Sequence, residues 1–244
     1  MVLLRRCLGT SQRVHLATSI CPQAGRYCLN RPVLRSTLTY PEATIVMVIC
    51  FGLFIVWSSQ AVLAGLPKAV FSDDTSLGMI VIELVLGTLA LVYLKGRQYD
   101  IASLYPKPEL RGALVGTGLY GAALFLELLA IAPFQKNGGL VDFSFSGVSV
   151  PSTVLMAMVN GTFEEMFLLG VLLRSFKPQG VAFAMGLSLV VRLLYHTYQG
   201  PVGVLCICVI GLVFSAFYVR TGRLWPVVFA HMLGDIVPVL LGEH

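Results

Sequence analysis

Seven apolar stretches of about 20 residues follow one another between residues 43 and 241, and they constrain the fold more than any other feature. A helix of roughly 20 apolar residues crosses a ~30 Å hydrocarbon core, and in lipid its backbone polar groups are satisfied internally. Charged residues make up only 12% of the chain, against about 25% in soluble domains. The pattern predicts an all-α, polytopic transmembrane helix bundle over residues 43–241, with about seven spans: 43–66, 77–94, 113–132, 152–173, 181–198, 202–219 and 224–241.

The lysine and arginine residues indicate the orientation of these spans, because cytoplasmic loops hold an excess of them. With the N-terminus inside, fourteen of the 17 fall on the cytoplasmic side, and only Lys68 and Lys136 fall outside. The remaining one, Arg192, lies within the fifth span. An odd number of spans then places residue 241 at the outer side.

Residues 1–42 form a basic N-terminal arm with six arginines and no acid before Glu42. This composition fits an organellar transit peptide, a disordered cytoplasmic arm, or non-native residues from an upstream start codon. The net charge of +5 follows from the arm and the loops, and no basic stripe with interleaved aromatics indicates nucleic-acid binding. We expect an integral membrane protein, by default of a prokaryotic plasma membrane, with an organelle or the endoplasmic reticulum as alternatives.

Glu164 and Glu165 lie side by side within the fourth span. A charged side chain at bilayer depth costs roughly 2.5–3.5 kcal/mol even on the mildest scale, so acids there indicate a functional site. Two further acids, Glu83 and Glu127, lie alone in the second and third spans. We expect those two to pack between helices or to lie near lipid headgroups.

Ionisable residues on two later spans extend this candidate site. A spacing of four residues places Arg192 with His196, and His231 with Asp235, on shared helix faces. With 1.5 Å per residue, Glu164, Arg192 and Asp235 lie roughly 15–16 Å from the cytoplasmic ends of their spans, and His231 about 10 Å. We therefore predict that residues from three spans meet in one reaction centre.

His196 does not fit this common depth, because the same arithmetic places it roughly 22 Å from the cytoplasmic end. A tilted helix, a later helix start near Met185, or unwinding around residues 198–201 would each bring it closer, since irregular backbone is tolerated beside a protein cavity. The sequence leaves all three open.

Three motifs follow one another in residues 152–237. Glu164-Glu165 is followed by Gly-Val-Leu-Leu-Arg at residues 170–174, His196 lies four residues after position 192, and His231 lies four before Asp235. Their order and spacing resemble the Glu-Glu-x-x-x-Arg, Phe-x-x-x-His and His-x-x-x-Asn/Asp motifs of the CAAX protease and bacteriocin-processing (CPBP, or Abi) family of intramembrane glutamic-type proteases.

Two positions depart from the family pattern. The motif arginine corresponds to Leu169, and the motif phenylalanine corresponds to Arg192. In the family pattern the arginine lies four residues from the second glutamate and can neutralise it. We expect Arg192 to neutralise Glu165 from the opposite side of the bundle instead, because a central arginine needs such a partner.

The resemblance implies an endopeptidase that hydrolyses peptide bonds of membrane-associated or lipid-anchored substrates without a covalent intermediate. In that mechanism, Glu164 and His196 deprotonate a water, and His231 with Asp235 holds the oxyanion that develops. Glu165 completes the set of catalytic residues. The implied partners are a peptide or protein substrate in or at the membrane and the lipid bilayer.

Three alternatives remain open. Leu169 in place of the motif arginine favours a catalytically silent membrane scaffold or regulator. A proton-coupled transporter would use similar groups, but no inverted repeat is visible. Glutamate and histidine are also zinc ligands, yet no His-Glu-x-x-His helix is present, so we expect no metal and no other cofactor.

Overall fold

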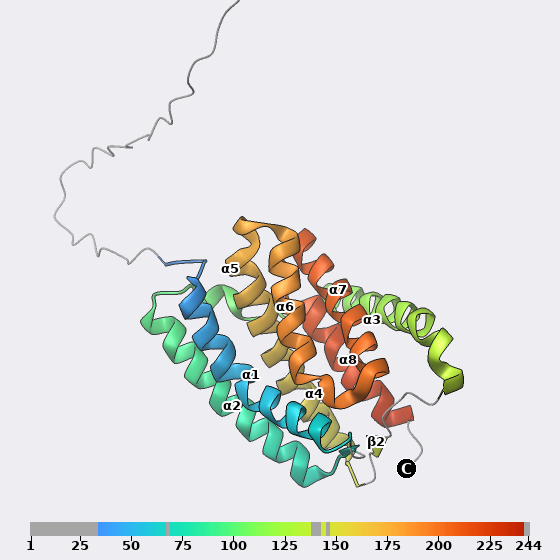
Figure 1. Ribbon diagram of the computed structural model, residues 1–244. Helices are drawn as coiled ribbons and strands as arrows, with labels where there is room; N and C mark the ends of the chain where they lie inside the picture. The colour runs from blue at the N-terminus through green and yellow to red at the C-terminus, as the bar shows by residue number, and fades with distance from the viewer. Residues whose placement is uncertain (1–33, 67–68, 138–142, 145–146, 242–244) are drawn as a thin grey trace, which may run out of the picture. The chain divides into compact units, whose positions relative to one another are not determined.

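The computed structural model describes residues 34–66, 69–137, 143–144 and 147–241. Main helices follow the seven predicted spans in order (Figure 1), which confirms the all-α bundle. They are α1 (Tyr40–Leu63), α2 (Asp73–Gly96), α3 (Leu110–Ile131), α4 (Val150–Glu165), α6 (Val181–Tyr195), α7 (Gly200–Thr221) and α8 (Trp225–Leu241). A π-helical segment, η3 (Met166–Leu173), and the short helix α5 (Arg174–Phe176) continue α4 without a break.

The remaining elements in the described parts of the chain are short. Four 3-10 turns are η1 (Ile101–Leu104), η2 (Ala132–Asn137), η4 (Lys177–Gln179) and η5 (Thr197–Gln199). Strands β1 (Ala69–Val70) and β2 (Phe143–Ser144) form one two-residue parallel pair. This pair joins the loop after α1 to the loop before α4.

Five helical stretches in the described chain are long and apolar enough to cross a membrane: α1, α2, α3, residues Val150–Gln179 and residues Thr197–Thr221. The other two, α6 with 15 residues and α8 with 17, are shorter. The fifth span was expected to continue to residue 198, but its helix ends at Tyr195. Turn η5 follows, and then Gly200 with a φ of 73°, a left-handed conformation that glycine adopts at little cost.

The first two helices begin before the apolar stretches that predict them, because polar residues cap them. The hydroxyl and backbone N–H of Thr39 both donate to the Glu42 carboxylate at the start of α1. Ser72 and Thr75 form a similar reciprocal cap on α2. Such caps satisfy backbone groups that have no partner within the helix.

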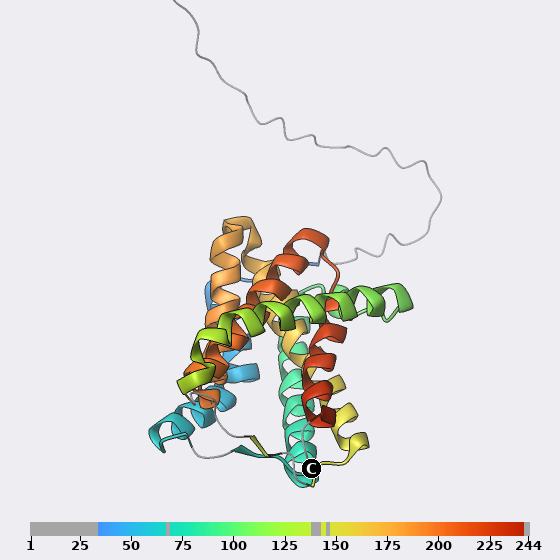
Figure 2. The same cartoon turned by 90° about the vertical axis from the view of Figure 1, so that its right-hand side faces the viewer.

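Helix α4 lies between α2 and α8, and these contacts place it inside the bundle. Helix α1 packs against α2 and α6, while α3 crosses α7 and α8 at a large angle (Figure 2). All eight residues of η3 are buried. The continuous helix from α4 to α5 is thus the central element of the described structure.

Residues predicted to be cytoplasmic lie together at one end of the bundle. Arg35 and Arg97 both pair with Glu42, so residues 34–39 of the predicted arm are held against α1 and the loop after α2. Residues 1–33 of that arm lie outside the described residues. At the other end, Ser149 donates to Asp73.

Candidate active site

Glu164 and Glu165 end helix α4, and both side chains are buried. Arg192 of α6 donates from Nη2 to Glu165 Oε1 over 2.7 Å and from Nη1 to Glu164 Oε2 over 3.3 Å. Leu169, at the family's arginine position, is fully buried. The structure therefore contains the expected cross-bundle pair between Arg192 and Glu165, and the same guanidinium also serves Glu164.

A glycine on α7 leaves room for this arginine. A Cβ atom on Gly211 would lie 2.8 Å from Leu189 and 3.3 Å from Cδ of Arg192. Contacts below about 3 Å do not occur between carbon atoms without displacement of one of them. Gly211 thus allows α6 to place Arg192 against the two glutamates.

His231 of α8 lies on the other side of Glu165. Its Nδ1 is 2.6 Å from Glu165 Oε1, and a carboxylate oxygen only accepts, so Nδ1–H is the donor. Its Nε2 lies 3.9 Å from Glu164 Oε2 and 3.8 Å from Asp235 Oδ1. Glu165 therefore orients the imidazole, and Nε2 faces the two other carboxylates.

Asp235 lies one turn beyond His231 and is held by a residue that the sequence analysis did not include in the site. Asn160 of α4 donates from Nδ2 to Asp235 Oδ2 over 3.0 Å, and the same atom is 3.4 Å from His231 Nε2. Asn160 precedes Glu164 by four residues, so the two share a helix face. This spacing of four residues is the feature of the sequence from which Asn160 could have been predicted as part of the site.

Tyr195 is a second residue that the motifs did not reveal. Its hydroxyl donates to Glu164 Oε2 over 2.5 Å, and its ring stacks on Phe51 of α1 with centroids 4.9 Å apart. Tyr195 follows Arg192 by three residues, which places both on the α6 face toward α4. Glu164 Oε2 thus has two donors from one helix.

His196 does not contact Glu164: no hydrogen bond or ion pair between them is present among the described residues. Its Nδ1–H donates to the Arg192 carbonyl over 2.9 Å, which leaves Nε2 without a proton in the neutral ring. Helix α6 begins at Val181, which excludes a later start near Met185, one of the three alternatives for the depth of His196. The chain instead leaves the α-helix at His196 and enters turn η5, close to the expected unwinding.

The π-helical segment η3 begins directly after Glu165. Two side chains from other parts of the chain bond carbonyl groups of this segment. Ser188 donates to the Leu168 carbonyl over 3.2 Å, and Tyr99 donates to the Gly170 carbonyl over 3.3 Å. The depth estimates assume a regular α-helix over the whole span, and this assumption is wrong beyond Glu165.

Three of these residues could also form a metal site. Glu164, Glu165 and His231 each offer a ligand atom, and the three atoms lie within 4.8 Å of one another. However, the Arg192 guanidinium already contacts both carboxylates, and its positive charge would repel a divalent cation at close range. The donor set is better matched to an arginine than to a metal.

One comparison with known proteins found a match. Residues 146–237 match the family model described as type II CAAX prenyl endopeptidase Rce1-like. No curated protein and no solved structure matches the chain. The matched segment includes α4, η3, α6, α7 and most of α8, and hence the whole cluster around Glu164 and Glu165. The resemblance of this chain to the CPBP family is therefore confirmed, and the segment that carries it is Rce1-like.

Proposed function

We propose that the protein is an intramembrane endopeptidase that hydrolyses peptide bonds of membrane-associated or lipid-anchored substrates. The observation that carries this proposal is the unequal use of the two Glu164 oxygens. Oε2 accepts hydrogen bonds from Tyr195 and Arg192, whereas Oε1 accepts none from any described residue. A carboxylate that is fixed through one oxygen keeps the other available to take a proton, as a general base must.

In the proposed reaction, Glu164 takes a proton from the attacking water and later gives it to the leaving amine. His196 has its Nε2 free to hold that water, as the family pattern implies. His231 donates from Nδ1 to Glu165, and with a second proton on Nε2 it also donates to the oxyanion. Donors that are fixed in advance in a dry site contribute several kcal/mol to such a step.

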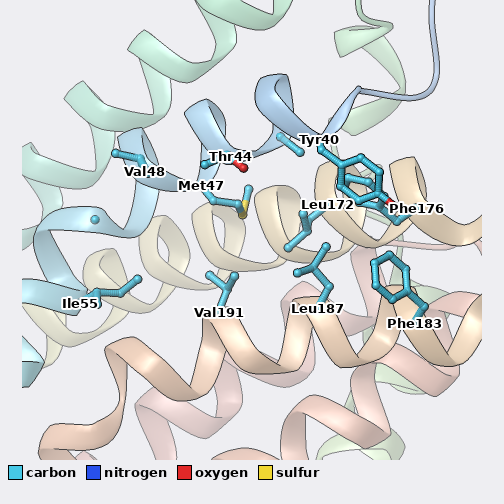
Figure 3. Close-up of a pocket in the computed structure, with 12 residues that line it drawn as sticks. Tyr40, Thr44, Met47, Val48, Ile55, Leu172, Phe176, Phe183, Leu187 and Val191 are labelled. Atoms are coloured by element: carbon cyan, nitrogen blue, oxygen red, sulfur yellow. The ribbon is translucent and has the colours of Figure 1, made fainter.

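An apolar pocket whose lining includes Val191 supports a substrate that carries a hydrocarbon chain. The pocket has a volume of about 270 Å³ and lies between α1, η3 and α6 (Figure 3). Its lining includes Met47, Leu172, Phe183 and Val191, and Val191 directly precedes Arg192. We propose that this pocket holds part of a lipid anchor, in agreement with the prenyl endopeptidase description of the family model.

The proposal is tested by proteomics of membrane-protein termini in cells with wild-type protein or Glu164→Gln. This substitution keeps the side-chain volume and removes the base. Uncut forms of the substrates should accumulate in the variant at equal protein abundance, and their new termini identify the cleaved bonds. Identical termini in both cells would favour the catalytically silent scaffold, for which Leu169 at the motif position is the supporting observation.

A further inference from the structure

Glu83 of α2 is a buried acid that the proposed mechanism does not use. Its side chain is only 3% exposed. Of the two positions expected for it, this agrees with packing between helices and not with a place near lipid headgroups. Its Oε2 atom is fully buried and has no hydrogen-bond partner among the described residues. An ionised carboxylate in such a position would be costly, because neither water nor a donor compensates the lost hydration.

The packing of α2 against α4 places Glu83 beside the catalytic cluster. Asp73 contacts Ser149, and Gly87 faces the Phe163 ring, whose Cδ2 would lie 3.3 Å from a Cβ at that glycine. Both contacts join residues 76 positions apart, so the two helices run parallel in one register. The same offset brings Glu83 level with residue 159, next to Asn160.

Charged groups on two helices lie within electrostatic range of Glu83. They are Glu164 of α4, and Asp235 and His231 of α8. Helix α1 also packs on α2, but no charged group from its described residues acts on Glu83. Glu83 therefore interacts with the cluster through electrostatics alone, because no hydrogen bond or ion pair joins the two among the described residues.

The hydrogen bonds distinguish Glu83 from the other three acids. Each of the other three accepts a bond from a donor side chain: Glu164, Glu165 and Asp235. Glu83 accepts none among the described residues. The positive groups are Arg192 and, when protonated, His231, which together balance two carboxylates. A fourth negative charge would oppose the negative charge that develops on the substrate oxygen.

We propose that Glu83 is a positioning residue of the catalytic centre, a neutral carboxylic acid whose proton keeps a further negative charge away from Glu164, Asp235 and His231. Its role rests on the proposed peptidase function, since the charge balance matters for the oxyanion. Glu83 forms no bond to the substrate and transfers no proton during the reaction. Its effect on the rate is electrostatic, through His231 and Asp235.

The first test is the pH profile of peptide cleavage by the full-length protein in nanodiscs. Wild-type activity should fall at alkaline pH as Glu83 loses its proton. Glu83→Gln cannot ionise, so only the loss of the second His231 proton should lower its activity at alkaline pH. It should therefore keep a larger share of its pH 7 activity than wild type does, with a rate near pH 7 within about threefold of wild type. Glu83→Met should also keep a larger share of its pH 7 activity at alkaline pH than wild type does, even if its rate is about tenfold lower at every pH.

Glu127→Gln is the matched control, because Glu127 is a lone acid on α3 for which no electrostatic interaction with the cluster is found. Its profile should follow the wild type. If Glu83 had a purely structural role, its substitution would change the cleavage rate by the same factor at every pH. Superimposable profile shapes for wild type, Glu83→Gln and Glu83→Met would overturn the proposal.

Infrared spectroscopy separates this proposal from the peptidase function. The difference between wild type and Glu83→Gln at pH 7, or Glu83→Met if the first variant does not accumulate, should contain the carbonyl band of a protonated carboxylic acid. A carboxylate band in its place would overturn the proposal in any case. If wild type cleaves no substrate but the acid band is present, the peptidase function fails while the neutral state of Glu83 stands.

Discussion

Arg192 is the residue on which the charge balance of the candidate site depends. It is buried and donates to both Glu164 and Glu165. Removing one partner from a buried ion pair typically costs about 3–5 kcal/mol, because the other charge is left uncompensated. The family pattern has the corresponding positive charge at the position of Leu169, whereas here the positive charge beside Glu165 comes from a different helix.

We predict that Arg192→Phe lowers both stability and activity, and that adding Leu169→Arg to it restores much of the loss. The double variant rebuilds both family motifs and again offers a positive charge to Glu165. Thermal unfolding in nanodiscs and cleavage rate are the measurements. Leu169→Arg alone is the control and should destabilise, because it adds a second buried cation. If Arg192→Phe is harmless, or if the double variant is as defective as the single one, Arg192 does not replace the motif arginine.

A second prediction at this scale concerns metal. Glu164, with Arg192 and Tyr195 on its Oε2, has the donors that a base needs without a cation. Purified protein should therefore keep its cleavage rate after treatment with a strong chelator. Loss of activity that added zinc restores would instead make Glu164, Glu165 and His231 metal ligands.

The sequence identified the charged members of the site and did not identify its neutral ones. Glu164, Glu165 and Arg192 are conspicuous because charge is rare in apolar spans. Tyr195 and Asn160 are not, since tyrosine and asparagine occur in many helices without such a role. Glu83 was visible as an acid, but its relation to the site depends on the parallel packing of α2 and α4. That register cannot be read from either helix alone.

At the scale of elements, α6 and the π-helical segment η3 determine the geometry. The apolar pattern predicted both regions as helical, because side-chain hydrophobicity reports burial. It did not predict where α6 ends or that η3 widens, because both are features of backbone geometry that side-chain hydrophobicity does not report. Such π-helical segments frequently occur at functional sites.

Gly211 provides a test of the packing between α6 and α7. Gly211→Ala places a methyl group against Leu189 and Arg192, so it should destabilise the protein by about 1–3 kcal/mol, as overpacking does, and slow cleavage. Thermal unfolding measures the first effect and the rate of peptide cleavage the second.

Gly186→Ala on α6 is the matched control. A Cβ at Gly186 would meet no atom within 4 Å, and alanine is the better residue inside a helix by roughly 0.5–1 kcal/mol. Equal effects of the two substitutions would contradict the close approach at Gly211.

At the scale of the whole molecule, the described structure gathers the predicted cytoplasmic charges at one end, and this allows a test of orientation. A cysteine at Ala64 should react with an impermeant thiol reagent from outside, and a cysteine at Lys107 should not. Both positions are exposed, and the native cysteines are replaced in both variants. The reverse labelling pattern would show that the charge asymmetry was read with the wrong polarity.

The central claim is that Glu164 activates water for peptide hydrolysis, and the most direct measurement is cleavage of a synthetic prenylated peptide by purified protein in nanodiscs. Wild type should cleave, Glu164→Gln should lose at least about 100-fold, the lower range for a removed general base, and Glu165→Gln should lose less. Glu127→Gln should cleave like wild type. Cleavage by Glu164→Gln at the wild-type rate, with equal folded protein, would contradict the claim.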